Sequence, residues 1–469
     1  MKALFGTDGI RGEAGRFPLD AATVKTIGYS LAKHLAETIN EPVITIGRDT
    51  RESGEWLEAA LIEGATQAGS QCLSAGVITT PGVAYLTRHL KANAGVVISA
   101  SHNPYQDNGI KIFSPSGEKI DDALERQIES DVEKGFKNIE RSDIKGSSNE
   151  GSNIEGSSNE GSALNPSHNA SASLRNDYLN FLHTDIAKDL SLQGLKMVVD
   201  CANGASTDFA PKLFESLGAH VIAINAKPDG RNINLNSGSL HIESLMEAVT
   251  DQQADLGVAF DGDADRSLFV DEKGGFVDGD ATLWVLANHL RSKGQLKDDT
   301  VVATVMSNVG LEVALRAAGI TLVRTDVGDK YVLDELLRRG ASLGGEQSGH
   351  IIIPALSLAG DGLITALCLL RALRETGRTL TEATADFQKY PQVLVNVHVR
   401  EKVPFAELGS VQAEVKDVEE RLSHKGRLLL RYSGTERLAR VMIEGEKQFE
   451  IEDYASRIAA AIKREIGAD

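Results

Sequence analysis

The sequence LGVAFDGDADR, from Leu256 to Arg266, joins a short apolar run to three closely spaced carboxylates. A run as short as Leu256 to Phe260, bounded by turn residues, predicts a buried strand with the aspartates in the loop that follows it. Similar runs recur at 42–46, 95–98, 195–199 and 300–305, separated by stretches with helical spacing such as 55–68 and 281–293. This alternation predicts βαβ units, with helices covering mixed or parallel sheets.

The chain has 469 residues, which is too long for one ordinary domain. We expect an α/β protein of three similar mixed-sheet domains, followed by a smaller α+β domain at the C-terminus. The expected domain ranges are 1–145, 174–255, 256–375 and 376–469, so that the three aspartates would open the third domain. Between the first two, residues 146–173 contain GSSNEGSNIE and its near repeat GSSNEGSALN, which have almost nothing to bury and predict a flexible surface insertion.

Composition and charge exclude several classes of protein. The net charge is −18, from 67 acidic and 49 basic side chains, which argues against a nucleic-acid partner. The apolar run at Met1 to Phe5 is far too short for a secretion signal or a spanning helix, so we expect no membrane association and a cytoplasmic location. The three cysteines, Cys72, Cys201 and Cys368, lie far apart and predict neither a disulfide framework nor a thiolate metal site.

The aspartates at positions 261, 263 and 265 are candidate metal ligands. Their mutual repulsion calls for a cation, and a set of oxygen ligands suits a hard divalent ion, with one Mg²⁺ favoured where a substrate phosphate completes the shell. A calcium EF-hand loop fits less well, because Arg266 stands where that loop needs glycine and a strand rather than a helix precedes it. A solvated acidic turn is the remaining alternative.

A second polar cluster, SASHNP from Ser99 to Pro104, follows the predicted strand at 95–98. A serine at the junction of a strand and a loop is a candidate nucleophile, although Ser, Asn and Pro also form ordinary turns. His102 is a candidate general base. Lys111 is a candidate acid or base if a cationic or apolar environment lowers its pKa.

Two later stretches of the sequence are suited to binding phosphate and sugar. Arg431-Tyr432-Ser433-Gly434-Thr435 combines a guanidinium, hydroxyls and a glycine that lets the backbone approach an anion, and Arg440 is a second guanidinium nearby. The stretch GGEQSGH, from Gly344 to His350, has the glycines of a P-loop but histidine in place of its lysine, which excludes nucleotide binding there. Its polar side chains suit a polyol, and a plain glycine-rich turn is the alternative.

In this order the motifs resemble the α-D-phosphohexomutase superfamily. That superfamily carries an FGTDGIRG start, a SASHNP serine loop, a DGDADR metal loop, a GE-x-SG sugar loop and an R-x-SGTE phosphate loop on four successive domains, and here they span nearly the whole chain. Their sequences are most similar to those of the bacterial members that interconvert glucosamine 6-phosphate and glucosamine 1-phosphate. Members that act on mannose or glucose phosphates are the alternative.

The resemblance implies a phosphoserine enzyme with a bisphosphorylated sugar intermediate. Ser101 would carry the phosphoryl group, with Mg²⁺ on Asp261, Asp263, Asp265 and one oxygen of that phosphate. Lys111, His102 and Arg11 would be the other catalytic residues of the phosphoryl transfer. The residues expected to bind the phosphorylated hexosamine are Arg266, Glu346, Ser348, His350, Arg431, Ser433, Gly434, Thr435 and Arg440. The resemblance also implies glucose or glucosamine bisphosphate as an activator, and it allows a homodimer.

The sequence departs from the superfamily pattern at two places. Arg437 follows Glu436 where the superfamily usually has proline, and the polar insertion has no counterpart in it. A different class of function also stays open: a non-enzymatic protein that binds a divalent cation or a sugar phosphate, in which Ser101 is only a turn residue.

Overall fold

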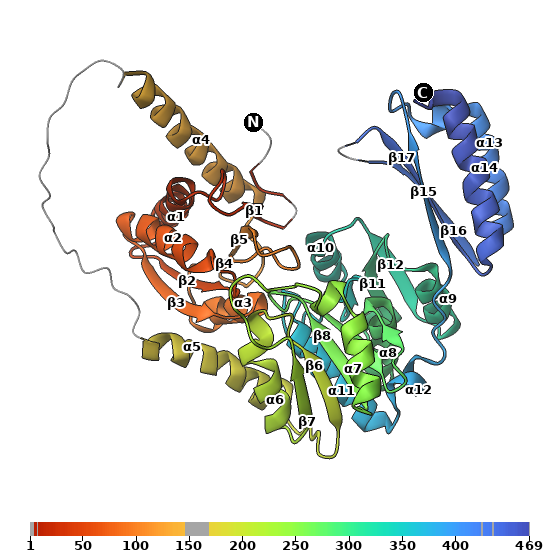
Figure 1. Ribbon diagram of the computed structural model, residues 1–469, viewed down its shortest axis with the longest axis horizontal. Helices are drawn as coiled ribbons and strands as arrows, with labels where there is room; N and C mark the ends of the chain where they lie inside the picture. The colour runs from red at the N-terminus through yellow and green to blue at the C-terminus, as the bar shows by residue number, and fades with distance from the viewer. Residues whose placement is uncertain (1–3, 7, 146–167, 424, 434–435, 469) are drawn as a thin grey trace, which may run out of the picture.

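The computed structural model describes residues 4–6, 8–145, 168–423, 425–433 and 436–468, and for 136–145 and 168 the backbone alone. Four units follow one another along the chain, the last of them smaller and set apart (Figure 1). Each of the first three combines helices with a sheet, which confirms the predicted fold class. Among the described residues, no helix is both long and apolar enough to cross a lipid bilayer.

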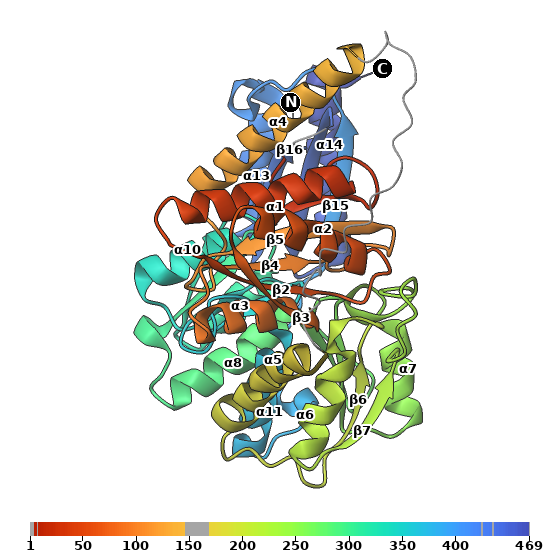
Figure 2. The ribbon, with the colours of Figure 1, turned by 90° about the vertical axis from the view of Figure 1, so that its left-hand side faces the viewer.

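The first unit contains a mixed five-stranded sheet in the order β1-β5-β4-β2-β3. Its strands are β1 (Ile10–Glu13), β2 (Val43–Arg48), β3 (Gln71–Val77), β4 (Ala94–Ile98) and β5 (Asp107–Phe113). Its helices are α1 (Ala21–Ala36), α2 (Gly54–Gln67), α3 (Thr80–His89), α4 (Asp122–Lys145) and α5 (His168–Phe181). Helices α1, α2 and α4 cover one face of the sheet, and α3 and α5 lie on the other (Figure 2).

The second unit contains a sheet in the order β10-β9-β8-β6-β7. Its elements are β6 (Lys196–Asp200), α6 (Ala210–Ser216), β7 (His220–Ile224), α7 (Glu243–Asp251), β8 (Leu256–Phe260), β9 (Ser267–Asp271) and β10 (Phe276–Val277). Strand β8 pairs in parallel with β6 and antiparallel with β9, so the aspartate loop between β8 and β9 belongs to this unit. The domain boundary predicted between residues 255 and 256 is therefore wrong, because it would cut through a hydrogen-bonded sheet.

The third unit has the strand order β12-β11-β13-β14. Its elements are α8 (Gly279–Ser292), β11 (Thr300–Thr304), α9 (Val309–Ala317), β12 (Thr321–Thr325), α10 (Asp329–Arg339), β13 (Gly344–Gly345), β14 (Ile351–Ile352), α11 (Gly362–Thr376) and α12 (Leu380–Thr384). Leu380 of α12 is buried in the core that this unit shares with the first two. The boundary predicted after residue 375 is thus also wrong, since the unit continues past it.

The C-terminal unit is an antiparallel sheet in the order β15-β17-β16, packed against two helices and a core of its own. Its elements are β15 (Gln392–His398), α13 (Gly409–Leu422), β16 (Gly426–Tyr432), β17 (Leu438–Gly445) and α14 (Gln448–Ile466). Short 3₁₀ or π segments lie at Leu182–Ile186, Ala205–Asp208, Gly238–Leu240, Lys297–Asp299 and Phe405–Glu407.

The predicted insertion at 146–173 lies only partly within the described residues. Residues 146–167 fall outside them, whereas 168–173 form the start of α5 rather than a flexible segment. This helix is tied to the first sheet, because Ser171 Oγ donates to the carbonyl oxygen of Ser74 at 2.8 Å and Arg175 donates to that of Ala75 at 2.8 Å.

Helices α1 and α2 cross so closely that the contact requires glycine. A methyl group at Gly64 would overlap the carbonyl oxygen of Lys25, and one at Gly28 would overlap that of Leu61. We expect Gly64→Ala to destabilise the protein by about 1–3 kcal/mol, because the two helices must move apart. Thermal unfolding measures this. Gly135→Ala is the control, since it meets nothing closer than 3.8 Å and should not lower the melting temperature.

Candidate active site

Three loops, one from each of the first three units, and strand β1 meet at the candidate site. The serine loop joins β4 to β5, the metal loop joins β8 to β9, and the sugar loop joins β13 to β14, while β1 contributes Arg11. Ser101 and Asp261 are almost completely buried. The Ser101 hydroxyl donates a hydrogen bond to Asp261 Oδ2 at 2.6 Å. The fold thus places the candidate nucleophile directly against the candidate metal ligands, although 160 positions separate the two in the chain.

Ser101 is held in a strained backbone conformation. Its φ angle is 53°, in the left-handed region, which costs a non-glycine residue about 1–3 kcal/mol. Its amide donates to Ser99 Oγ at 2.9 Å, and its carbonyl oxygen accepts from Arg51 at 3.0 Å and from Asn234 at 2.9 Å. Because Asn234 belongs to the second unit, the serine takes up this conformation through contacts from two units.

Arg51 holds the backbone of the serine loop in place, a role that was not predicted from the sequence. It is 1% exposed and forms an ion pair with Asp49 at 2.8 Å. Its guanidinium donates to the carbonyl oxygens of Ser101, Asn103, Pro104 and Asp107. The available signal was an arginine two residues from an aspartate in GRDTR, a pattern that surface ion pairs share.

Gly262 allows the metal loop to approach the serine loop. A Cβ atom there would lie 2.6 Å from the carbonyl oxygen of Ser101 and 2.8 Å from Asn234 Nδ2. Both contacts are closer than real Cβ atoms show, so any side chain at this position would push the two loops apart.

The three aspartates form a site that fits a divalent cation. Asp261, Asp263 and Asp265 each offer a carboxylate oxygen, and these oxygens lie within 4.8 Å of one another. All three side chains are buried, and Oδ1 of Asp263 and Oδ1 of Asp265 have no hydrogen-bond partner. Burial, and then repulsion from the other two carboxylates, raises the pKa of Asp261 well above its usual range. Unpartnered buried carboxylate oxygens of this kind are suited to a hard metal ion.

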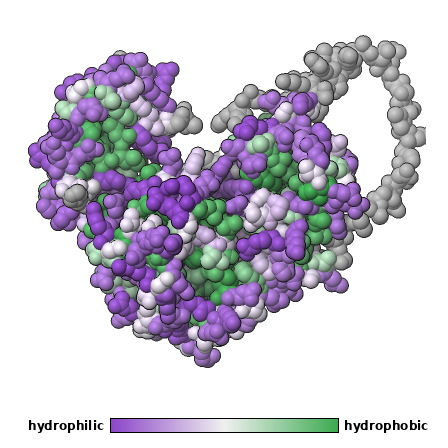
Figure 3. All heavy atoms as spheres, turned by 180° about the vertical axis from the view of Figure 1, so that it is seen from behind, coloured by the Kyte–Doolittle hydropathy of each residue, from purple (hydrophilic) through white to green (hydrophobic). Residues whose placement is uncertain are grey.

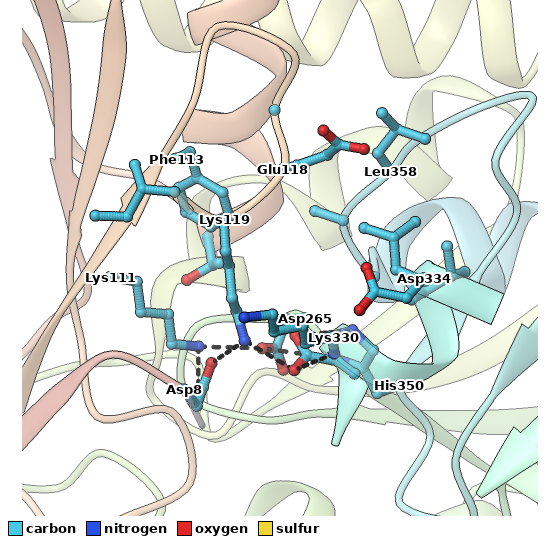
Figure 4. A pocket seen from close by; sticks show the side chains of 18 of the residues that line it. Asp8, Lys111, Phe113, Glu118, Lys119, Asp265, Lys330, Asp334, His350 and Leu358 are labelled. Atoms are coloured by element: carbon cyan, nitrogen blue, oxygen red, sulfur yellow. Dashed lines mark hydrogen bonds and ion pairs between the residues drawn. The ribbon is translucent and has the colours of Figure 1, made fainter. Parts of the chain in front are cut away.

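Lys111 lies in β5 beside these carboxylates. Its ammonium forms ion pairs with Asp263 at 3.0 Å, Asp265 at 3.2 Å and Asp8 at 3.3 Å. Burial alone would lower the pKa of Lys111, but these carboxylates raise it well above its usual value. Neither of the environments that would lower its pKa is therefore found, because the surroundings of this lysine are acidic rather than cationic or apolar. In Figure 4 the side chains of Lys111, Asp8 and Asp265 converge on one wall of a cavity of about 490 Å³.

His102 and two arginines line a neighbouring cavity of about 610 Å³. Arg266 Nη1 lies 3.2 Å from His102 Nδ1, and Arg11 donates to Asn103 Oδ1 at 3.3 Å. Burial, and then the charges of Arg266 and Arg11, lower the pKa of His102 to about 4. The imidazole is thus neutral at neutral pH, and this wall of the cavity presents two guanidiniums to an anion.

The sugar loop lines the same cavity through Glu346 and His350. Glu346 accepts hydrogen bonds from the Gly328 amide at 3.2 Å and from Ser348 Oγ at 3.1 Å. His350 Nδ1 lies 3.7 Å from Asp265 Oδ2. Although burial opposes it, this carboxylate raises the pKa of His350 to about 9. The structure therefore brings the sugar loop and the metal loop together.

The expected phosphate-binding residues stand apart on the C-terminal unit. Arg431 and Arg440 are opposite each other on β16 and β17, and Ser433 follows β16. Gly434 and Thr435 lie outside the described residues. Seen from behind, an open notch separates this unit from the first (Figure 3). Within the described ranges, no hydrogen bond or ion pair joins Arg431 or Arg440 to the serine, metal or sugar loops.

Models of four protein domains match the chain in order. They are the phosphoglucomutase/phosphomannomutase alpha/beta/alpha domain I at residues 2–138, domain II at 176–275, domain III at 278–390 and the C-terminal domain at 394–461. Domain II includes the metal loop, in agreement with the sheet to which β8 belongs.

Full-length relatives and solved structures resemble the chain throughout its length. A phosphoglucosamine mutase of Solibacter usitatus is 48% identical over 466 residues, covering 99% of both chains. One of Koribacter versatilis is 45% identical over 470 residues, covering 100% of this chain and 98% of the relative. A phosphoglucomutase/phosphomannomutase family protein of Burkholderia thailandensis shares the fold, with a TM-score of 0.75 at 20% identity, covering 99% of this chain and 98% of that one.

The contact at Gly262 yields a test of the site geometry. We expect Gly262→Ala to reduce kcat by about 100-fold, because the added methyl group displaces Ser101 from Asp261. Steady-state kinetics on a variant with an unchanged melting temperature measure this. Ala264→Gly is the control in the same loop: its φ of 57° suits glycine, so its kcat should stay within about threefold of wild type. Normal turnover in Gly262→Ala would mean that the two loops need not touch.

Proposed function

Because the chain belongs to the phosphoglucomutase/phosphomannomutase family, we propose that it is an intramolecular phosphotransferase that interconverts glucosamine 6-phosphate and glucosamine 1-phosphate. The names of its relatives support this choice of sugar, since those at 45–48% identity over the full length are called phosphoglucosamine mutase. The observation that carries the reaction type is the buried Ser101 hydroxyl, 2.6 Å from Asp261 in a cluster of three aspartates.

Ser101 is the residue that carries the phosphoryl group. In the first transfer the bond between phosphorus and Ser101 Oγ breaks, and a bond to the free sugar hydroxyl forms. The resulting bisphosphorylated sugar turns around and returns its other phosphoryl group to Ser101. In each transfer one proton passes between the sugar hydroxyl and Ser101 Oγ, and we assign that relay to Lys111. Its ion pairs hold it as an ammonium that can donate to the departing oxygen.

Asp261, Asp263 and Asp265 hold one Mg²⁺, since hard oxygen ligands and a phosphate suit that ion. When bound, the ion offsets the negative charge that spreads over the transferring phosphoryl group. Arg11 and Arg266 bind oxygens of the same group, and the neutral imidazole of His102 lies beside them.

The remaining residues must accept the sugar in both of its orientations. Glu346, Ser348 and His350 bind ring hydroxyls, which are arranged similarly in the two orientations. The phosphate that is not reacting is bound by Arg431, Ser433, Gly434, Thr435 and Arg440. A bisphosphorylated glucose or glucosamine activates the enzyme by supplying the phosphoryl group to an unmodified Ser101.

Phosphate on Ser101 is the first test of this function. We expect the wild-type protein to turn over glucosamine 6-phosphate faster than glucose or mannose phosphates, and to carry phosphate on Ser101 in intact-mass and peptide analysis. Ser101→Ala should remove both the activity and the phosphate while leaving the melting temperature unchanged, because the hydroxyl is the nucleophile. Near-normal turnover by this variant would refute the assignment. A preference for glucose or mannose phosphates would refute the choice of sugar.

The metal loop supplies the second test. We expect Asp263→Asn to weaken Mg²⁺ binding and to lower kcat by about 100-fold or more, since the counter-charge at the phosphoryl group is reduced. Calorimetric titration with Mg²⁺ and kinetics after chelation measure this. Asp271→Asn is the matched control, because that buried aspartate ends β9 away from the cluster. If Asp263→Asn binds Mg²⁺ and turns over like the control, the loop does not hold the ion.

A further inference from the structure

The C-terminal unit meets the third unit at a joint made by Glu444 of β17. This side chain is fully buried. Its Oε2 accepts from the Val309 amide at 3.0 Å, and its Oε1 accepts from Asn308 Nδ2 at 3.3 Å. Asn308 is also the N-cap of α9, since its side chain accepts from the Gly310 amide. The carboxylate thus sits against the N-terminus of a helix, where a negative charge is favourable.

Arg427 completes the joint from the neighbouring strand. It lies opposite Glu444 in the register of β16 and β17, and its guanidinium contacts that carboxylate at 2.8 Å. Another nitrogen of the same guanidinium donates to the carbonyl oxygen of Val305 at 2.7 Å. The ion pair therefore reaches the third unit through both of its members.

The joint is continuous with the sugar loop. The amide of Asn308 donates to Asp280 Oδ2 at 2.7 Å, and the same oxygen accepts from Gln347 Nε2 at 3.3 Å. Gln347 stands between Glu346 and Ser348. Glu444 thus connects the C-terminal unit to the part of the third unit that carries the sugar-binding side chains.

The strands that carry the joint also carry the phosphate-binding arginines. Arg431 and Arg440 face each other four positions along β16 and β17 from Arg427 and Glu444. At about 3.3 Å per residue, this places the arginines about 13 Å from the joint. A rotation of about 10° at the joint would then move them by about 2 Å, which is enough to break a contact with a phosphate.

The C-terminal unit does not need Glu444 for its own core. Its buried apolar residues form a separate cluster that draws on β15, β17, α13 and α14. Among the described residues, the groups that bond to the carboxylate of Glu444 belong to the third unit, apart from Arg427. A role confined to the folding of the C-terminal unit would not explain a buried charge that faces outward from it.

We propose that Glu444 is a positioning residue, which orients β16 and β17 so that Arg431 and Arg440 meet the non-reacting phosphate of a sugar held by the sugar loop. This role rests on the proposed function. Glu444 acts through the arginines and touches no substrate itself, so its loss weakens substrate binding while Ser101, Lys111 and the metal loop keep their contacts.

The variant Glu444→Gln tests this role because it keeps the side chain's shape and removes its charge. We expect KM for glucosamine 6-phosphate to rise about tenfold and kcat to change less than threefold. Hydrogen exchange should become faster at the Val309 and Tyr390 amides, which the joint protects through Glu444 and Asn308. Glu420→Gln, an exposed glutamate on α13, is the control and should change neither quantity. Arg427→Gln should reproduce the effect if Glu444→Gln fails to fold.

A comparison of combined variants separates positioning from a general loss of stability. If Glu444 acts through Arg431 and Arg440, then adding Glu444→Gln to a variant that carries both Arg431→Ala and Arg440→Ala should raise KM little further. Effects on KM that multiply would overturn the proposal. Unchanged hydrogen exchange at the Val309 and Tyr390 amides in Glu444→Gln would also overturn it, and so would faster exchange with an unchanged KM. Failure of the proposed function would appear differently, as a wild-type enzyme that does not turn over glucosamine phosphates. Hydrogen exchange at the Val309 and Tyr390 amides would in that case still report whether Glu444 stabilises the contact between the C-terminal unit and the third unit.

Discussion

The mutual repulsion of three buried carboxylates is the constraint around which the site is arranged. Asp261, Asp263 and Asp265 bring their oxygens within 4.8 Å of one another, away from the water that would otherwise screen them. The free-energy cost of burying these like charges side by side is offset by cationic side chains from three units, namely Lys111, Arg266 and His350. The same concentration of negative charge suits a divalent cation, so one feature serves both the assembly of the units and the chemistry.

Ser101 gains its position from elements that have no chemical role of their own. Arg51 ties together the carbonyl groups of the serine loop, and Asn234 adds a donor from the second unit. Gly262 leaves room for the two loops to touch. The strained backbone at Ser101 persists because these contacts determine it more strongly than local preference does. The Ser101 hydroxyl is therefore held by the packing of two units rather than by the serine loop alone.

The fold class and the family could be predicted because they rest on local patterns. Short apolar runs before polar loops identified strands such as Leu256–Phe260, and the motif order fitted four successive units. The boundary at residue 256 was wrong for the same reason, since an apolar run has the same appearance whichever sheet it joins. The sheet of β8 is decided by its hydrogen bonds to β6, and those partners lie 59 positions apart between Met197 and Leu256.

The sequence by itself determined which chemical groups are present: the three aspartates, the serine loop, Lys111 and the arginines expected to bind phosphate. It also determined that the aspartates and the serine loop each follow a strand. Only the tertiary structure decided the environment of each group. The sequence left open whether the environment lowers the pKa of Lys111, and packing places this lysine among carboxylates that raise it. Arg51 could have been a surface residue, and packing makes it the buried support of the serine loop. The physical reason is that charge and burial are summed over neighbours in space, and those neighbours come from distant parts of the chain.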